Sequence, residues 1–151
     1  MGAEVTGVDN PEKLEFIRSL GADHVIDYTR ADFTRNGPSY ELILDLAAHR
    51  SALAYNRSLA PGGRYLYVGG SAATLLQVLL IGPLLGRAES KKLRLLAVRL
   101  GAERLTPLVA LCQAGTIVTV IDRRYRLHEV PEALRYLGEG HAKGKLVAIV
   151  E

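Results

Sequence analysis

Short apolar runs rich in β-branched residues alternate with stretches of helical periodicity along the chain. Strand-like runs occupy residues 4–9, 24–28, 41–46, 64–68, 93–98, 116–121 and 145–150. Helical patterns occupy residues 11–20, 48–59, 103–114 and 130–137, and an apolar helix is expected to begin near Thr74. Strands that alternate with helices are typical of a parallel sheet covered by helices. The pattern therefore predicts an α/β protein with a doubly wound parallel sheet.

The first predicted helix has clear boundary signals. Asn10 is placed to cap it, and Pro11 fits its first position, where a missing N–H costs nothing. Leu14 and Ile17 fall on one face, and Gly21 is placed to end the helix.

Composition is ordinary for a globular domain and limits the kinds of binding partner to expect. The 151 residues are 48% hydrophobic and 23% charged, which excludes a disordered chain. The formal net charge is +3 with scattered basic residues, so no nucleic-acid partner is expected. The apolar segment 75–86 is shorter than the roughly 20 residues a membrane helix needs, and it contains a Gly-Pro pair. No membrane partner and no secretory signal are expected, and a cytoplasmic location is the simplest interpretation.

Metal and nucleophile chemistry find no support in the sequence. The single cysteine, Cys112, lies in an apolar helical pattern and is expected to be a small core residue. The four histidines show neither metal-ligand spacing nor helical pairing with a carboxylate, and we expect structural or surface roles for them: His24, His49, His128 and His141. No metal site is therefore expected, and the catalytic residues stay unassigned.

Candidate binding residues follow from the predicted sheet, because open α/β sheets bind ligands beyond the carboxyl ends of their strands. Asp9 is the sharpest of them, since an acidic side chain at this place can accept hydrogen bonds from ribose hydroxyls. Its charge would also repel a ribose 2'-phosphate by up to ~4 kcal/mol at close range, which favours NAD over NADP. The alternative is that Asp9 helps to cap the next helix. Lys13 could reach the same ligand or be an ordinary solvated lysine.

Two glycines after the fourth predicted strand, Gly69 and Gly70, allow close approach of a ligand to the backbone. They could equally form a plain turn from strand to helix.

The order of these motifs resembles a known superfamily. The segments VTGVDNPEKLEFIRSLGADHVIDYTRADFT, YELILDLAAHRSALAYNRSLAPGGRYLYVGG and VIDRRYRLHEVPEALRYLGEGHAKGKLVAIV are similar to the cofactor domain of medium-chain dehydrogenases/reductases. The likeness is to the zinc-independent, quinone-oxidoreductase-like branch of this superfamily, which includes the zinc-binding dehydrogenases. It implies a Rossmann-type domain over residues 1–121 and, at 122–151, a return segment that in the family joins the catalytic domain.

The resemblance also implies an activity and a set of residues. It implies hydride transfer between NAD(P)H and a carbonyl, quinone or activated alkene, without zinc, in a homodimer. Residues at matching positions are expected to contact the cofactor. They are Asp9, Lys13, Tyr28, Leu46 and Ala47 toward the adenosine, Gly69, Gly70, Ser71, Ile121 and Asp122 toward the nicotinamide, and Lys145 near the pyrophosphate or nicotinamide.

Two departures from the family change these expectations. The family's first strand and its glycine-rich turn, which anchors the pyrophosphate, normally precede GAEVTGV, and Met1 stands in their place. The family's substrate domain is also absent. We therefore expect a chain truncated at its N-terminus and a poor catalyst, with a slot between the strand at Val5 and the strand at Ile43. The alternative is a non-catalytic remnant that acts as a dimerisation or interaction module.

Overall fold

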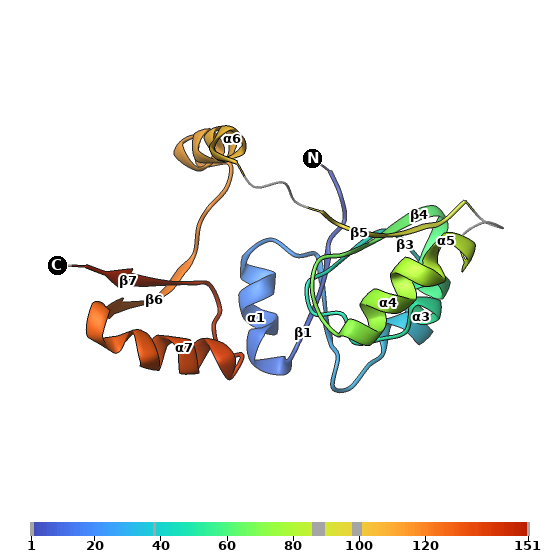
Figure 1. The fold of residues 1–151 in the computed structure, drawn as a ribbon, viewed down its shortest axis with the longest axis horizontal. Helices are drawn as coiled ribbons and strands as arrows, with labels where there is room; N and C mark the ends of the chain where they lie inside the picture. Colours follow the sequence, from blue (N-terminus) through green and yellow to red (C-terminus); the bar gives the residue numbers. More distant parts are fainter. Residues whose placement is uncertain (1, 38, 86–89, 98–100, 151) are drawn as a thin grey trace. The chain divides into compact units, whose positions relative to one another are not determined.

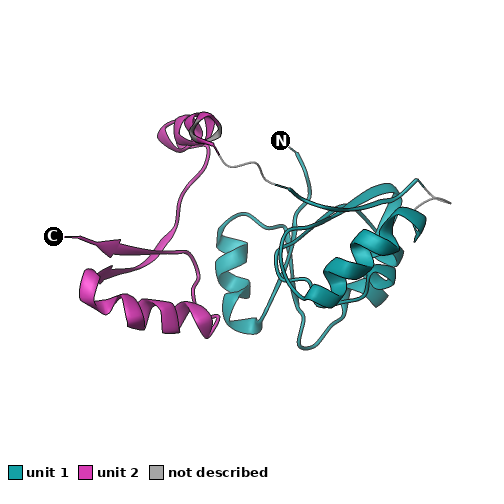
Figure 2. Cartoon of the chain, viewed as in Figure 1, with its two compact units in different colours: residues 1–98 teal, residues 99–151 magenta. Residues whose placement is uncertain are grey.

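The structure is a computed structural model that describes residues 2–37, 39–85, 90–97 and 101–150. It confirms an α/β protein whose strands pair in parallel. The chain divides into two compact units, residues 1–98 and residues 99–151 (Figure 2). The boundary expected at residue 121 comes from the family resemblance and stays a prediction.

In its described residues, unit 1 contains two separate parallel sheets, and Figure 1 labels the three strands of the larger one, β3, β4 and β5. The first sheet pairs β1 (Thr6–Asp9) with β2 (His24–Asp27), and α1 (Pro11–Ser19) connects the two strands. The second sheet has the order β3-β4-β5. Its elements, in chain order, are α2 (Phe33–Asn36), β3 (Tyr40–Asp45), α3 (Ala52–Ser58), β4 (Leu59–Tyr67), α4 (Ala72–Leu80), α5 (Gly82–Leu85) and β5 (Lys92–Leu95).

The hydrophobic core of unit 1 belongs to the second sheet. Tyr65 of β4 is fully buried, and its ring stacks on that of Tyr55 in α3 with 4.3 Å between centroids. Leu59 of β4, Val78 of α4 and Leu93 of β5 belong to the same cluster. Aromatic residues of this size dominate the energetics of a core, so this sheet is held by its own helices.

Unit 2 is built around one pair of strands. Its elements are α6 (Ala102–Gln113), β6 (Ile121–Arg126), the 3-10 turn η1 (Leu127–Glu129), α7 (Val130–Gly138) and β7 (Lys145–Ile149). β6 and β7 pair in parallel, with Tyr125 the buried residue of β6. Arg123 lies 3.9 Å from the centre of the Tyr136 ring, a cation–π contact between β6 and α7.

The sequence-based starts of α3 and β4 in unit 1 were wrong. The helix predicted from residue 48 begins at Ala52, because Ala48 donates to and accepts from the segment that follows β4. β4 begins at Leu59 and not at residue 64, and a register irregularity absorbs the extra residues. α2 was missed, although Asp32 caps it by accepting from the Thr34 N–H.

In unit 2 the strand predicted at residues 116–121 lies instead at Ile121–Arg126. The run 116–121 was expected to form a short strand, whereas the ladder uses the charged segment that follows and buries one of its residues, Tyr125. Cys112 was expected in a core and is exposed. In unit 1, the strand predicted at 93–98 ends at Leu95, and its last predicted residue, Val98, lies outside the described residues. Among the described residues, no helix combines the length and apolar character needed to cross a bilayer.

Candidate functional site

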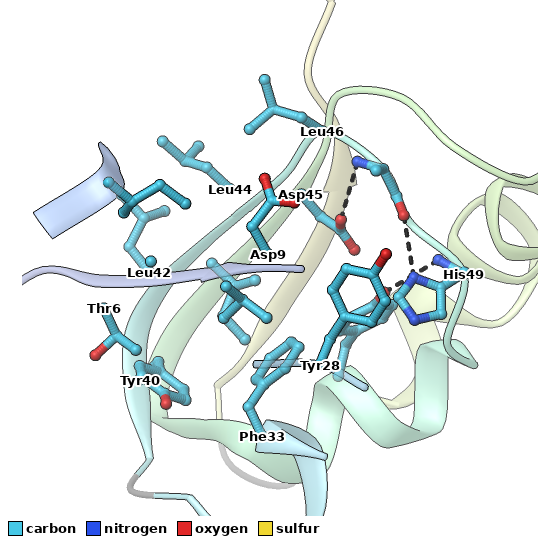
Figure 3. A pocket seen from close by; sticks show the side chains of 16 residues that line it. Thr6, Asp9, Tyr28, Phe33, Tyr40, Leu42, Leu44, Asp45, Leu46 and His49 are labelled. Carbon is cyan, nitrogen blue, oxygen red and sulfur yellow. Dashed lines mark hydrogen bonds between the residues drawn. The ribbon is translucent and has the colours of Figure 1, made fainter. Parts of the chain in front are cut away.

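A cavity of about 690 Å³ lies between the two sheets of unit 1, bordered by β1 on one side and β3 on the other (Figure 3). Thr6 and Tyr40, which begin the two strands, lie at one end, and Tyr28 and His49 lie at the other. The carboxyl ends of β1, β2 and β3 therefore meet at one mouth of this cavity, where the sheet rule places a ligand.

Asp9 ends β1 at this mouth. One of its carboxylate oxygens, Oδ1, accepts from the Asn10 N–H at 2.8 Å. No protein donor among the described residues contacts the other oxygen. Asn10 occupies the N-cap position of α1, as predicted. Its side chain makes no capping hydrogen bond to the helix. Asp9 thus combines a local backbone contact with an oxygen that remains available for a ligand.

Tyr28 and His49 form an aromatic corner beside Asp9. Their rings meet edge to face with 6.1 Å between centroids, and the Tyr28 side chain is 41% exposed. His49 Nδ1 lies 3.1 Å from the carbonyl oxygen of Ala47, a hydrogen bond that holds the ring in place. Sequence reasoning treated His49 as a structural or surface residue. Its place four residues beyond the end of β3 was the signal that could have identified it as a cavity residue.

Asp45 ends β3 and is held by hydrogen bonds from two sides. The Tyr65 hydroxyl donates to Oδ2 at 2.9 Å, and the Ala47 N–H approaches Oδ1 at 3.3 Å. Burial, followed by the charge of Asp45, raises the pKa of Tyr65. Burial also raises the pKa of Tyr55 to about 12. The Tyr55 hydroxyl accepts from the backbone N–H groups of His49 and Arg50, and the Tyr65 hydroxyl holds Asp45. Together they fix the loop that carries Leu46, which is 75% exposed, and Ala47.

The glycines after β4 pack against the loop after β3. A Cβ atom on Gly70 would collide with the backbone of Ala48, and one on Gly69 would come within 2.9 Å of the Leu46 carbonyl oxygen. Ser71 caps α4 by accepting from the Thr74 N–H at 3.1 Å. This packing explains why glycine is needed here, and the predicted contact with nicotinamide stays a prediction.

Of the remaining candidates, Lys13 belongs to unit 1 and the others belong to unit 2. Lys13 sits in the first turn of α1 and does not line the cavity. Ile121 and Lys145 face each other across the β6–β7 ladder of unit 2. Asp122 accepts hydrogen bonds from the Lys143 N–H and the Tyr136 hydroxyl. The structure thus brings together Asp9, Tyr28, Leu46 and Ala47, and adds His49.

The residues at the mouth fit the adenosine part of a nicotinamide nucleotide. A carboxylate oxygen can accept from ribose hydroxyls, and exposed aromatic and aliphatic groups can contact a base. No group of three histidine, cysteine or acidic side chains suited to a metal ion occurs among the residues that the structure describes. The expected absence of zinc stays a prediction.

Comparison with known proteins shows the family to which the chain belongs. Residues 20–148 match the family model for zinc-binding dehydrogenases. Over 95% of its length, the chain is 27% identical to the chloroplastic quinone-oxidoreductase QR1 of Triphysaria versicolor, of which it covers 44%. Over 99% of its length, it is 30% identical to the mitochondrial NAD(P)H oxidoreductase RTN4IP1 of Mus musculus, of which it covers 42%.

Solved structures show the same fold. The quinone oxidoreductase from Coxiella burnetii superposes on 99% of the chain with a TM-score of 0.81 and 22% identity, and the match covers 46% of that protein. The chain thus spans less than half the length of the relatives it matches. It belongs to the zinc-binding dehydrogenase family of the medium-chain dehydrogenase/reductase superfamily and corresponds to that superfamily's cofactor-binding region.

Proposed function

We propose that the chain forms the adenosine side of the nicotinamide-nucleotide site in an NAD(P)H-dependent oxidoreductase. The observation that carries the proposal is the meeting of Asp9, Tyr28 and His49 at the carboxyl ends of β1, β2 and the loop after β3. The names of its relatives, quinone-oxidoreductase and NAD(P)H oxidoreductase, support a nicotinamide cofactor.

When bound, the nicotinamide supplies the hydride chemistry. The residues at the mouth of the cavity would hold the adenosine end of the cofactor. Asp9 offers its available oxygen to the ribose hydroxyls, while Tyr28 and His49 provide ring surface for the base. Asp45, anchored by Tyr65, holds the neighbouring loop in place. We propose quinones, carbonyls and activated alkenes as the substrate classes, on the basis of the relatives.

NAD is the proposed cofactor of choice. A 2'-phosphate on the ribose would place its negative charge near the Asp9 carboxylate, which is unfavourable by up to ~4 kcal/mol before screening. Homodimer formation and a cytoplasmic location stay predictions.

Fluorescence titrations of the chain with NADH and with NADPH test the proposal. We expect saturable binding with NADH as the tighter ligand, and we expect Asp9→Asn to remove most of that preference. Glu15→Gln is a matched control, because Glu15 is an exposed acid on α1 whose side chain is 84% exposed. Equal affinity for both cofactors before and after the Asp9 change would contradict the role given to Asp9. Absence of binding below millimolar concentration would contradict the cofactor site itself.

A further inference from the structure

A second cavity, of about 530 Å³, lies at the amino ends of β3 and β4. Two of its lining residues, Ser39 and Ser58, directly precede these strands. The first residues of the two strands, Tyr40 and Leu59, are partners in the parallel ladder, so the amino ends lie side by side. The candidate cofactor site lies at the carboxyl ends, where open α/β sheets bind their ligands. The second cavity is therefore a separate place on the sheet.

The side chains that line the second cavity carry positive charge. Arg35 lies in the last turn of α2, and Arg57 lies in the last turn of α3. None of the described residues that line this cavity is acidic. By contrast, Asp9 and Asp45 line the cavity of about 690 Å³, to which no described lysine or arginine contributes. The second cavity therefore favours an anion.

Both guanidinium groups keep hydrogen-bond donors for a ligand. Arg57 makes no ion pair or hydrogen bond with any described residue. Arg35 approaches Asp32 Oδ2 through its Nε, at 3.5 Å, which leaves its two terminal nitrogens available. The same carboxylate oxygen lies 3.6 Å from Arg50 Nη1, so one negative charge is shared between two cations. Asp32 therefore does not cancel the positive charge at the cavity.

The helices that carry the two arginines pack against each other. Phe33 of α2 contacts Tyr55 of α3, with 6.3 Å between the ring centroids. The loop after α2 is equally close-packed, because a Cβ atom on Gly37 would come within 2.8 Å of the Phe33 carbonyl oxygen. The backbones that carry Arg35 and Arg57 are thus already in place, which lowers the cost of ordering when a ligand binds.

Hydroxyl groups form the remaining polar lining. Thr34 and Ser58 are buried, and their hydroxyls already donate to protein acceptors. Ser39 is exposed, and its hydroxyl has no partner among the described residues. The side-chain donors that remain for a ligand are therefore two guanidinium groups and the hydroxyl of Ser39.

We propose that this cavity binds the phosphate group of a small phosphorylated molecule. A phosphate monoester carries about 1.5 to 2 negative charges at pH 7, which matches two guanidinium groups. Arginine also pairs with phosphate oxygens through two parallel hydrogen bonds. The cavity is larger than a bare phosphate and falls within the roughly 300–1,000 Å³ typical of small-molecule sites. Phe33, labelled in Figure 3, borders both cavities and supplies an apolar wall for the organic part.

The test titrates the isotope-labelled chain with phenyl phosphate, without nucleotide, so that its result does not depend on the proposed cofactor site. We expect saturable NMR shifts at the amides of Gly37, Ser39 and Ser58, with a dissociation constant below about 1 mM. Phenol keeps the ring and lacks the phosphate, so it should bind at least about tenfold more weakly. Shifts confined to Asp9 and Tyr28 would overturn the proposal, and so would equal affinity for phenol.

A substitution identifies the donors. Arg57→Gln should weaken the binding of phenyl phosphate by at least about tenfold, because it removes one of the two charges that face the ligand. Arg18→Gln is the matched control, since Arg18 is an exposed arginine on α1 that lines neither cavity. Equal affinity in Arg57→Gln and in the unchanged chain would overturn the proposal. The comparison with phenol uses the unchanged chain and keeps the test valid if the variant folds poorly.

Two further ligands identify the source of the phosphate group. Inorganic phosphate and a short phosphoserine peptide should both bind more weakly than phenyl phosphate, because neither places a ring against Phe33. Equal affinity for inorganic phosphate would overturn the assignment to a phosphorylated molecule. Tighter binding of the peptide would overturn it in favour of a phosphorylated protein partner.

Discussion

The two sheets of unit 1 differ in what holds them. The β3–β4–β5 sheet has an interior of its own, with Tyr55, Tyr65 and Leu59 at most 1% exposed. In the β1–β2 sheet all four residues of β1 are only partly buried, and α1 buries none of its residues. Two strands alone are marginally stable in water. The first sheet therefore has no interior of its own among the described residues, whereas the second is held by its own helices.

The largest expected effect comes from the core of the second sheet. Tyr65→Ala should lower the free energy of unfolding by about 3–5 kcal/mol, because it removes a fully buried aromatic ring. Val8→Ala in the partly buried β1 should cost about 1 kcal/mol or less. Urea unfolding, monitored by hydrogen exchange at the strand amides, measures the loss of free energy of unfolding in each variant. Equal losses would break the comparison, because they would mean that the two sheets share one interior.

The next largest effect is expected where the loop after β4 packs against the loop after β3. Gly70 has a φ of +131°, and an added Cβ would collide with the backbone of Ala48. Gly70→Ala should therefore cost about 3 kcal/mol, from backbone strain together with the clash. Gly62 is the control, because its φ is +76° but nothing lies within 4 Å of an added Cβ, so that Gly62→Ala should cost about 1 kcal/mol. Similar costs at both glycines would contradict the packing role of Gly70.

The Tyr65 hydroxyl offers a smaller and pH-dependent test of the same sheet. Tyr65→Phe keeps the stacking on Tyr55 and removes the hydrogen bond to Asp45, at a cost of about 1–2 kcal/mol near neutral pH. The folded-state pKa values of both tyrosines lie above the ordinary value of 10.0. Their contribution is thus complete below pH 10 and is lost as the pH rises through the folded pKa, about 12 for Tyr55. Urea unfolding from pH 8 to 12 should show a shallower decline in Tyr65→Phe, and an unchanged slope would contradict this assignment.

The alternation of strands and helices was predictable from the sequence, because apolar periodicity reports which faces are buried. The places where prediction failed are decided by long-range contacts. Residues 48–51 have helical character in the sequence, but the backbone N–H and C=O of Ala48 form hydrogen bonds with the segment after β4. β6 forms from charged residues because β7 lies alongside.

The candidate site was predictable only in part, for a similar reason. Asp9 and Tyr28 could be predicted because they lie at the carboxyl ends of predicted strands. The place of His49 depends on the fold of a loop, since its ring is oriented by Ala47 and meets Tyr28 from a different sheet. The family resemblance, rather than periodicity, assigned a nicotinamide nucleotide to these residues.

The smallest expected effect concerns Asp32, which joins the segment after β2 to the second sheet. It caps α2 through Thr34 and pairs with Arg50, in the loop after β3, at 3.6 Å. The Thr34 hydrogen bonds, opposed in part by burial, hold the pKa of Asp32 below its ordinary value of 3.8. A lowered pKa means that the contribution of Asp32 is complete above pH 3.8 and is lost as the pH falls through the folded pKa.

Asp32→Ala should therefore cost about 1 kcal/mol at pH 7, and the difference from the unchanged chain should shrink below pH 4. Urea unfolding at pH 7, 5 and 3 measures this difference. Arg50→Gln separates the two roles, because it removes the ion pair and leaves the cap intact. If hydrogen exchange in β1 and β2 quickens with Arg50→Gln as much as with Asp32→Ala, the ion pair supports the first sheet. If only Asp32→Ala has this effect, the cap alone matters, and the ion pair with Arg50 gives the first sheet no measurable support.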